Sequence, residues 1–210
     1  MILIASGSAG VGKNEILKRL LLRDHQFRVP RSWTTRSLRA DDFGGIKNYR
    51  FVDHETFMDK VAANGFAEWK EVHGGNLYGT PIEELNDQSA RDTLLEIDCE
   101  GAIDIKRMNG EVVAVFFLPP SYSVLEGRLR KRATDSEDSI QTRLQTSTKE
   151  IARVAKFDYW IENDDLDVAV ADLQELIATL RNGRVPRYKF TNYELLSRVR
   201  STFPLSATTA

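Results

Sequence analysis

A glycine-rich stretch near the start of the sequence limits what this chain can fold into. Gly7, Ser8, Ala9, Gly10, Val11, Gly12 and Lys13 match the pattern G-x-x-x-x-G-K and directly follow the apolar run at residues 2–5. The residues after Lys13 are amphipathic, with Ile16, Leu17, Leu20 and Leu21 recurring on one side. A short buried strand, a glycine loop and a helix in this order are the context that a phosphate-binding loop requires.

The glycines of this loop let the backbone curl, so that successive N–H groups point into one concavity at a helix N-terminus. Lys13 would then reach the β- and γ-phosphates of a nucleoside triphosphate. A strand–helix turn without a ligand is the alternative. The residues that follow, Asn14 and Glu15, replace the Ser or Thr that usually helps to hold Mg²⁺. Because Mg²⁺ keeps several waters, Asn14 could still contribute through one of them.

The bulk composition excludes several classes of protein. With 210 residues, 41% of them hydrophobic and 29% charged, the chain suits one globular domain with insertions. A net charge of −2 gives no field that would attract nucleic acid. No apolar run approaches the roughly 20 residues of a membrane span. The single cysteine, Cys99, fits a reducing cytoplasm, and three histidines do not make a metal cage.

Strands and helices alternate along most of the chain, which predicts an α/β fold with a parallel sheet. After the first helix, core strands are expected at 27–29, 93–98, 112–118 and 159–161. Core helices are expected at 100–108, 121–130, 136–155 and 166–180.

Residues 32–80 form a small β-rich insert in this interpretation. Its elements are a polar basic run at 32–39, strands at 48–52 and 66–72, a helix at 54–64 and a turn at 73–80. Pro81 then opens a helix.

The tail after residue 180 is basic. It contains one more possible helix at 193–199. That helix could pack back on the core before a frayed end, or it could contact a partner or a second copy of the chain.

Several sequence blocks, taken in order, resemble the guanylate kinase family of P-loop nucleoside monophosphate kinases. They comprise the phosphate loop, Thr34-Thr35-Arg36-x-x-Arg39-x-x-Asp42, Tyr49-x-Phe51-Val52, Glu68 with Tyr78-Gly79-Thr80, Ile97-Asp98-x-x-Gly101, Pro119-Pro120-Ser121, Arg132-x-Thr134-Asp135-Ser136 and Asn163-Asp164. The resemblance covers residues 1 to about 180. Departures from the family pattern occur at positions 14, 15, 38 and 41, and in the length of the glycine turn before Tyr49.

The resemblance implies a three-layer P-loop NTPase-type core that transfers the γ-phosphoryl group of ATP to GMP with Mg²⁺. Residues 1–31 and 81–180 would be the core, with a helical lid at about 132–148. Residues 32–80 would be the GMP-binding insert and 181–210 a basic extension, through which a homo-oligomer could form. The implied partners are ATP and GMP, with no nucleic acid and no membrane, and the implied location is the cytoplasm.

The resemblance also assigns individual residues. The GMP-binding set is Ser32, Arg36, Arg39, Asp42, Tyr49, Glu68, Tyr78, Thr80 and Asp98. The ATP-binding set is residues 7–14 with Asn163, and the catalytic set is Lys13, Arg36, Asp98, Arg132 and Arg143. Asn14 and Asp98 are the candidates for contact with Mg²⁺ or its waters.

The chemistry of these assignments is consistent with the residue types. Arg36 and Arg39 lie three residues apart in a basic loop and suit a 5′-phosphate. Guanine presents two hydrogen-bond donors, at N1 and at its amino group, and an ionised Glu68 could accept from both, whereas adenine presents an acceptor at N1. Arg132 and Arg143 would neutralise charge on the transferred phosphoryl group when the lid closes.

Simpler structural roles remain open for some of these residues. Glu68 could be an exposed residue of an alternating strand, Asp98 could be a helix cap, and the arginines could belong to a solvated face. Two other functions are a guanylate-kinase-like module that binds a partner without catalysis, and a kinase of another small phosphorylated acceptor. Retention of Lys13, Arg132 and Arg143 disfavours the module, and Glu68, Tyr78 and Thr80 disfavour the other acceptor.

Overall fold

The computed structural model describes residues 1–38, 48–72, 75–86, 91–131, 136–186 and 188–205. The chain forms two compact units, one of Met1–Ile4 with Leu21–Val113 and one of Ala5–Leu20 with Ala114–Ala210. Strand β1 (Ile2–Gly7) contributes its beginning to the first unit and its end to the second. This division follows contacts within each unit, and the proposed boundaries of core, insert and lid stay a prediction.

In the first unit, a short parallel pair joins β2 (Phe27–Arg28) to β7 (Asp92–Glu96), with Phe27 opposite Asp92. Strand β7 lies between β2 and β1 in the strand order. Helix α4 (Cys99–Met108) follows β7 directly, and Asp98 caps its N-terminus. The predicted strand and helix are therefore confirmed, and the capping role of Asp98 is real.

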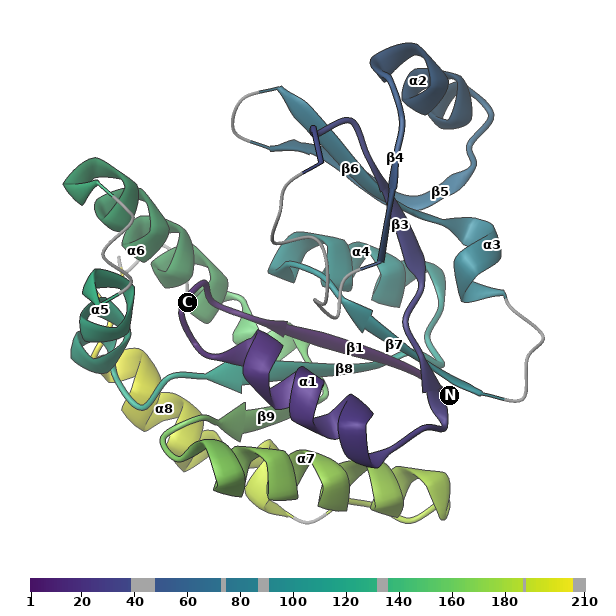
Figure 1. Ribbon diagram of the computed structural model, residues 1–210. Helices are drawn as coiled ribbons and strands as arrows, with labels where there is room; N and C mark the ends of the chain where they lie inside the picture. The colour runs from purple at the N-terminus through teal and green to yellow at the C-terminus, as the bar shows by residue number, and fades with distance from the viewer. Residues whose placement is uncertain (39–47, 73–74, 87–90, 132–135, 187, 206–210) are drawn as a thin grey trace. The chain divides into compact units, whose positions relative to one another are not determined.

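The same unit contains a four-stranded sheet in the order β4-β3-β6-β5 (Figure 1). Its strands are β3 (Arg31–Thr34), β4 (Asn48–Phe51), β5 (Phe66–Val72) and β6 (Asn76–Pro81). One face packs on α2 (His54–Ala62) through a core of Phe57, Phe66 and Leu77, with Trp33 against it. Figure 1 shows α2 on one side of this sheet and α4 on the other.

Two expectations for this region were wrong. Part of the polar run forms strand β3, and residues 76–81 form strand β6 where the sequence predicted a turn. Pro81 ends β6, and helix α3 (Ile82–Leu85) begins after it. Both strands were missed because β3 pairs with β4 and β6, and β6 also pairs with β5; hydrogen bonds to neighbouring strands stabilise polar segments that have no apolar pattern of their own.

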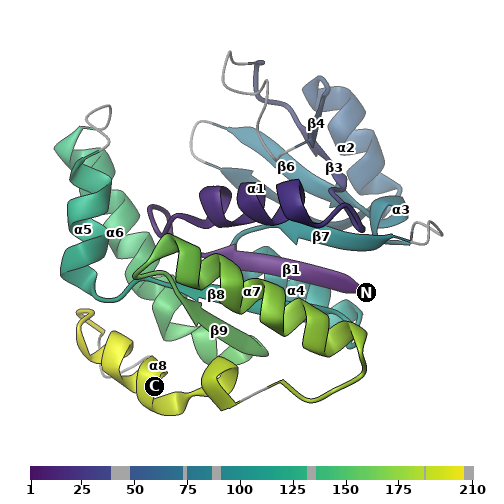
Figure 2. The same ribbon diagram turned by 60° about the horizontal axis from the view of Figure 1, so that its bottom comes forward.

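In the second unit, β8 (Val113–Leu118) lies between the end of β1 and β9 (Tyr159–Glu162), and β8 and β9 are parallel. Helices α1 (Lys13–Arg23) and α7 (Leu166–Arg181) lie side by side on one face of these strands (Figures 1 and 2). Helix α5 (Tyr122–Arg130), helix α6 (Glu137–Ala152) and the 3₁₀ turn η2 (Val154–Lys156) complete the segment between β8 and β9. The predicted α/β fold with a parallel sheet is confirmed.

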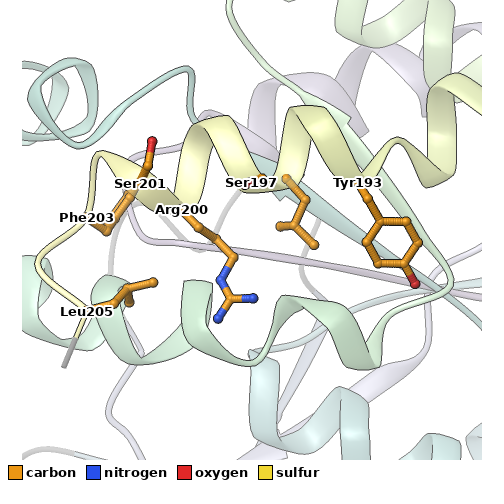
Figure 3. Close-up of a pocket in the computed structure, with 7 residues that line it drawn as sticks. Tyr193, Ser197, Arg200, Ser201, Phe203 and Leu205 are labelled. Atoms are coloured by element: carbon orange, nitrogen blue, oxygen red, sulfur yellow. The ribbon is translucent and has the colours of Figure 1, made fainter. Parts of the chain in front are cut away.

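The C-terminal extension is an integral part of the second unit. Phe190 of the 3₁₀ turn η3 (Tyr188–Thr191), Leu196 and Val199 of helix α8 (Tyr193–Ser201), and Phe203 after it are buried. The ring of Phe203 packs edge-on against Tyr122, with centroids 5.3 Å apart. Figure 3 shows Tyr193, Ser197, Arg200 and Ser201 along a pocket beside α8, and none of the predicted site residues lines that pocket.

None of the helices in the described ranges has the length and apolar character that crossing a membrane requires.

Candidate active site

The glycine loop joins β1 to α1 in the second unit. Gly10 and Gly12 have φ angles of +88° and +93°, a backbone region that side chains with a Cβ rarely adopt. A Cβ at Gly12 would also lie 2.5 Å from Asn163 Nδ2. Glycine is therefore required at both positions to let the loop curl ahead of the helix N-terminus.

The carbonyl of Val11 is the point at which the rest of the unit holds this loop. It accepts hydrogen bonds from Asn163 Nδ2 at 2.6 Å and from Arg128 Nη1 at 3.4 Å. The same Arg128 nitrogen donates to the Asn163 carbonyl at 2.8 Å. Asn163 is 5% exposed, so its observed contact supports the loop, while the predicted contact with adenine is untested.

Arg128 was missed by sequence reasoning. Its partners lie 117 and 35 residues away along the chain, so no local pattern marks it.

Lys13 and its neighbours take separate directions at the start of α1. Lys13 Nζ donates to the carbonyl of Gly7 at 3.0 Å, so the side chain lies back across the loop. Asn14 is exposed. Glu15 pairs with Arg19 at 3.0 Å, and Arg19 also pairs with Asp167 at 2.6 Å. The negative charge of Glu15 is thus partly compensated along the helix.

An ion pair joins α6, which carries part of the predicted lid at about 132–148, to the preceding helix α5. Arg130 on α5 contacts both carboxylate oxygens of Glu137 on α6, at 2.5 and 2.9 Å, and also binds Glu126. Hydrogen bonds from Arg130 and Gln141 lower the pKa of Glu137 to about 2. Arg143 is partly exposed on α6. Arg132 lies outside the described residues, so its predicted role stays a prediction.

The second group of predicted residues gathers on one face of the four-stranded sheet in the first unit. Glu68 lies opposite Thr80, and Lys70 opposite Tyr78, in the antiparallel pair β5–β6. Ser32 lies opposite Tyr49 in the pair β3–β4. Because side chains of residues directly opposite share a face, this face is polar, whereas the other face packs on α2.

Arg36 is held at this polar face by two tyrosines. Its Nε donates to the Tyr78 hydroxyl at 3.1 Å, and its guanidinium carbon lies 5.5 Å from the centroid of the Tyr49 ring. Arg36 is only 8% exposed, so it does not belong to a solvated surface. Of the predicted phosphate-binding residues, the structure thus brings these three together. Arg39 and Asp42 lie outside the described residues.

Glu68 is held by Thr80, whose hydroxyl donates to Glu68 Oε1 at 2.7 Å. Burial raises the pKa of Glu68 above its ordinary value, and the hydrogen bond from Thr80 and the charge of Lys70 act in the opposite direction. Glu68 is therefore not a freely solvated residue of an alternating strand. Its carboxylate has a defined orientation and a perturbed acidity.

Asp98 uses both carboxylate oxygens. Oδ1 accepts from the backbone N–H groups of Glu100 and Gly101 at 3.0 and 3.1 Å, and Oδ2 pairs with the ammonium of Lys70. Lys70 was not among the predicted residues, although its position two residues after Glu68 on an alternating strand puts both side chains on one face.

The described residues do not form a protein-made metal site. No group of three or more His, Cys, Asp or Glu side chains among them could hold a metal ion. Both carboxylate oxygens of Asp98 already have partners, which does not suit a direct ligand, whereas Asn14 next to Lys13 is exposed, as a contact with a water of the ion would require. These residues fit an Mg²⁺ ion that is held mainly by phosphate oxygens and water.

Comparison with known proteins identifies relatives over most of the chain. The family model for guanylate kinase matches residues 1–180. A guanylate kinase of Carboxydothermus hydrogenoformans is 42% identical over 179 residues, which are 84% of this chain and 87% of the relative. One from Rickettsia felis is 40% identical over 183 residues, or 86% and 94% of the two chains.

A solved structure agrees with these sequence relatives. The crystal structure of guanylate kinase from Anaplasma phagocytophilum superimposes with a TM-score of 0.66 at 30% identity. The match covers 98% of this chain and 96% of that one, so it includes the region after residue 180.

Proposed function

Because the chain belongs to the guanylate kinase family, we propose that its two groups of polar residues divide the work of one phosphoryl transfer. The enzyme is a nucleoside monophosphate kinase that transfers the γ-phosphoryl group of ATP to GMP, giving ADP and GDP. The glycine loop of the second unit would hold the donor, and the polar sheet face of the first unit would hold the acceptor.

The donor residues are proposed from the geometry of the loop. The backbone N–H groups of residues 7–13 would surround the phosphates of ATP, and Lys13 would leave the Gly7 carbonyl to contact the β- and γ-phosphates. Asn163 and Arg128 would keep the loop in its curled form through Val11. The hydroxyl of Ser8 is buried and has no hydrogen-bond partner in the described part of the chain, as expected of a group that would hydrogen-bond to a ligand.

The acceptor residues are proposed from the polar sheet face. Arg36, Tyr49 and Tyr78 would bind the phosphate of GMP, together with Arg39 and Asp42 from outside the described residues. Glu68 would accept hydrogen bonds from N1–H and the amino group of guanine while Thr80 orients it. Ser32 and Asp98 would complete the contacts with the base.

Phosphoryl transfer itself needs positioning and positive charge more than covalent chemistry. We assign Arg132 and Arg143 to the charge that develops on the transferred group. Bound Mg²⁺ would neutralise phosphate charge, and Asn14 would contact its waters. Movement of the lid, at about residues 132–148, would exclude water from the reaction.

Two further expectations accompany this function. The enzyme would work in the cytoplasm, in keeping with its single buried Cys99. A homo-oligomer could form through the C-terminal extension, although Leu196 and Val199 of α8 are already buried and Tyr193 is its large exposed side chain.

The observation that carries the assignment of the acceptor is the hydrogen bond that fixes Glu68 on the polar face next to Thr80. A coupled assay of ADP release with GMP, AMP, CMP and UMP, each with ATP and Mg²⁺, tests it directly. Turnover should be confined to GMP, and omission of Mg²⁺ should abolish it. Equal rates on all four nucleotides would reject the role of Glu68.

A further inference from the structure

Lys70 is a charged residue of the polar sheet face to which the sequence assigned no role. It lies on β5 two residues after Glu68 and directly opposite Tyr78. Its side chain is 39% exposed, and its ammonium contacts Oδ2 of Asp98, whose side chain is 27% exposed. Lys70 therefore links the strand that carries Glu68 to the residue that caps α4.

Glu68 and Asp98, the two carboxylates of the predicted guanine site, both lie near the first turn of α4. Asp98 Oδ1 is bound to the first turn of α4 through the N–H groups of Glu100 and Gly101. A Cβ placed on Gly101 would lie 3.2 Å from Glu68 Oε2, so this carboxylate approaches the same turn of the helix closely. Glycine at position 101 leaves room for that approach.

The groups that act on Glu68 come from three elements, β5, β6 and α4. Burial and the negative charge of Asp104 on α4 raise the pKa of Glu68. Lys70 on β5 and the hydroxyl of Thr80 on β6 lower it. Asp98 adds a second acid that Lys70 contacts directly. Without Lys70, less positive charge would compensate the negative charges of Glu68, Asp98 and Asp104.

We propose that Lys70 is a positioning residue of the guanine site, whose ammonium orients Asp98 and places a positive charge beside Glu68 where the base would bind. Ionised carboxylates accept hydrogen bonds from both donors of guanine, whereas a protonated carboxyl presents a donor of its own to the same edge. This inference rests on the proposed binding of GMP at this face.

The Lys70–Asp98 pair is partly exposed, so its effect on GMP binding can be distinguished from an effect on stability. Partly exposed ion pairs contribute little to the free energy of unfolding. Replacement of Lys70 should therefore leave the fold intact, and an effect on GMP would be measured in a folded protein.

The test compares Lys70→Met, which keeps the length of the side chain, with Lys70→Arg, which keeps the charge. GMP binding is measured by calorimetry, and kcat/KM for GMP is measured between pH 5 and 9. Lys70→Met should weaken GMP binding about threefold or more at the acidic end of this range. The acidic limb of the profile should move to higher pH, while the KM for ATP stays unchanged. Lys70→Arg should behave like the natural enzyme.

Lys60→Met is a control for loss of a lysine ion pair, because Lys60 pairs with Glu83 at 2.7 Å and lies on α2, which packs on the other face of the sheet. It should leave the pH profile for GMP unchanged. An unchanged profile in Lys70→Met, or tighter GMP binding at every pH, would overturn the inference.

Glu68→Gln distinguishes failure of the role of Lys70 from failure of the proposed guanine site. If it abolishes use of GMP while Lys70→Met has no effect, the inference fails alone. If it too has no effect, the proposed guanine site fails with it.

Discussion

Replacement of Glu68 by Gln perturbs the proposed guanine contact with little change in volume. The side chain keeps its length and one oxygen that can accept a hydrogen bond from Thr80. In the natural protein the hydroxyl of Thr80 lies 2.7 Å from the Glu68 carboxylate. The amide NH₂ of Gln replaces the second acceptor, so one donor of guanine meets another donor. The variant therefore loses a charge-assisted hydrogen bond and leaves a buried donor unpaired.

The expected size of the effect follows from these two losses. A hydrogen bond to a charged group contributes about 1.5–3 kcal/mol, and an unsatisfied buried donor costs about 1–3 kcal/mol. Together they predict a loss of roughly 2.5–6 kcal/mol, which corresponds to a fall of about 10²- to 10⁴-fold in kcat/KM for GMP. The KM for ATP should not change, because the proposed ATP contacts come from the loop of the second unit.

The same variant has an opposite effect on stability. Since the pKa of Glu68 is raised in the folded protein, the folded state binds a proton more tightly than the unfolded one, and the free energy of unfolding falls as pH rises above 4.5, the ordinary value for Glu, through the folded pKa. Glu68→Gln lacks this titration. It should therefore be more stable than the natural protein at pH 8, and this advantage should be smaller at pH 4.

Coupled ADP release at varied GMP and then varied ATP measures the first effect, and urea unfolding at pH 4 and pH 8 measures the second. Glu71→Gln is the control, because Glu71 is an exposed residue one position from Lys70 on β5 and its side chain faces the other side of the sheet. The reasoning would be refuted by a kcat/KM for GMP within threefold of that of the natural enzyme. It would also be refuted if the KM for ATP rose by the same factor by which kcat/KM for GMP fell.

Three other variants test the loop and the extension. Lys13→Met should lower kcat at least about 10²-fold with a melting temperature close to that of the natural protein, and retained turnover would refute the phosphate contact. Asn14→Ser should raise kcat several-fold at limiting Mg²⁺, measured by titration of the metal; no change would show that the hydroxyl is dispensable in this loop. Phe203→Ala removes a buried ring packed on Tyr122 and should cost about 3–5 kcal/mol in urea unfolding, whereas Val185→Ala, at a 92% exposed position, should cost nothing measurable. Equal stability of these last two variants would mean that the extension does not contribute to the unit.

Local patterns in the sequence were sufficient for much of the architecture. The glycine loop before α1 could be predicted from its residues, because Gly10 and Gly12 have positive φ angles that glycine adopts more readily than other residues. The apolar run of β8 and the amphipathic helices likewise follow from periodicity. The alternation of β5 placed Glu68 on one face of a strand, and the family resemblance indicated its purpose.

Other features depend on contacts between distant segments. Strands β3 and β6 were missed because their hydrogen-bond partners, rather than their own composition, stabilise them. The extension after residue 180 lies beyond the family match, and only the structure shows that Phe203 packs on Tyr122.

The sequence by itself determined the curled glycine loop before α1 and the alternation of strands and helices, because both depend on neighbouring residues. It predicted Glu68 as the acid for guanine through the family resemblance. Only the tertiary structure decided which side chains support these features. Arg128 reaches Val11 across 117 positions, and Lys70 meets Asp98 across 28. The physical reason is that a hydrogen bond or an ion pair depends on distance in space, and the packing of whole elements sets that distance.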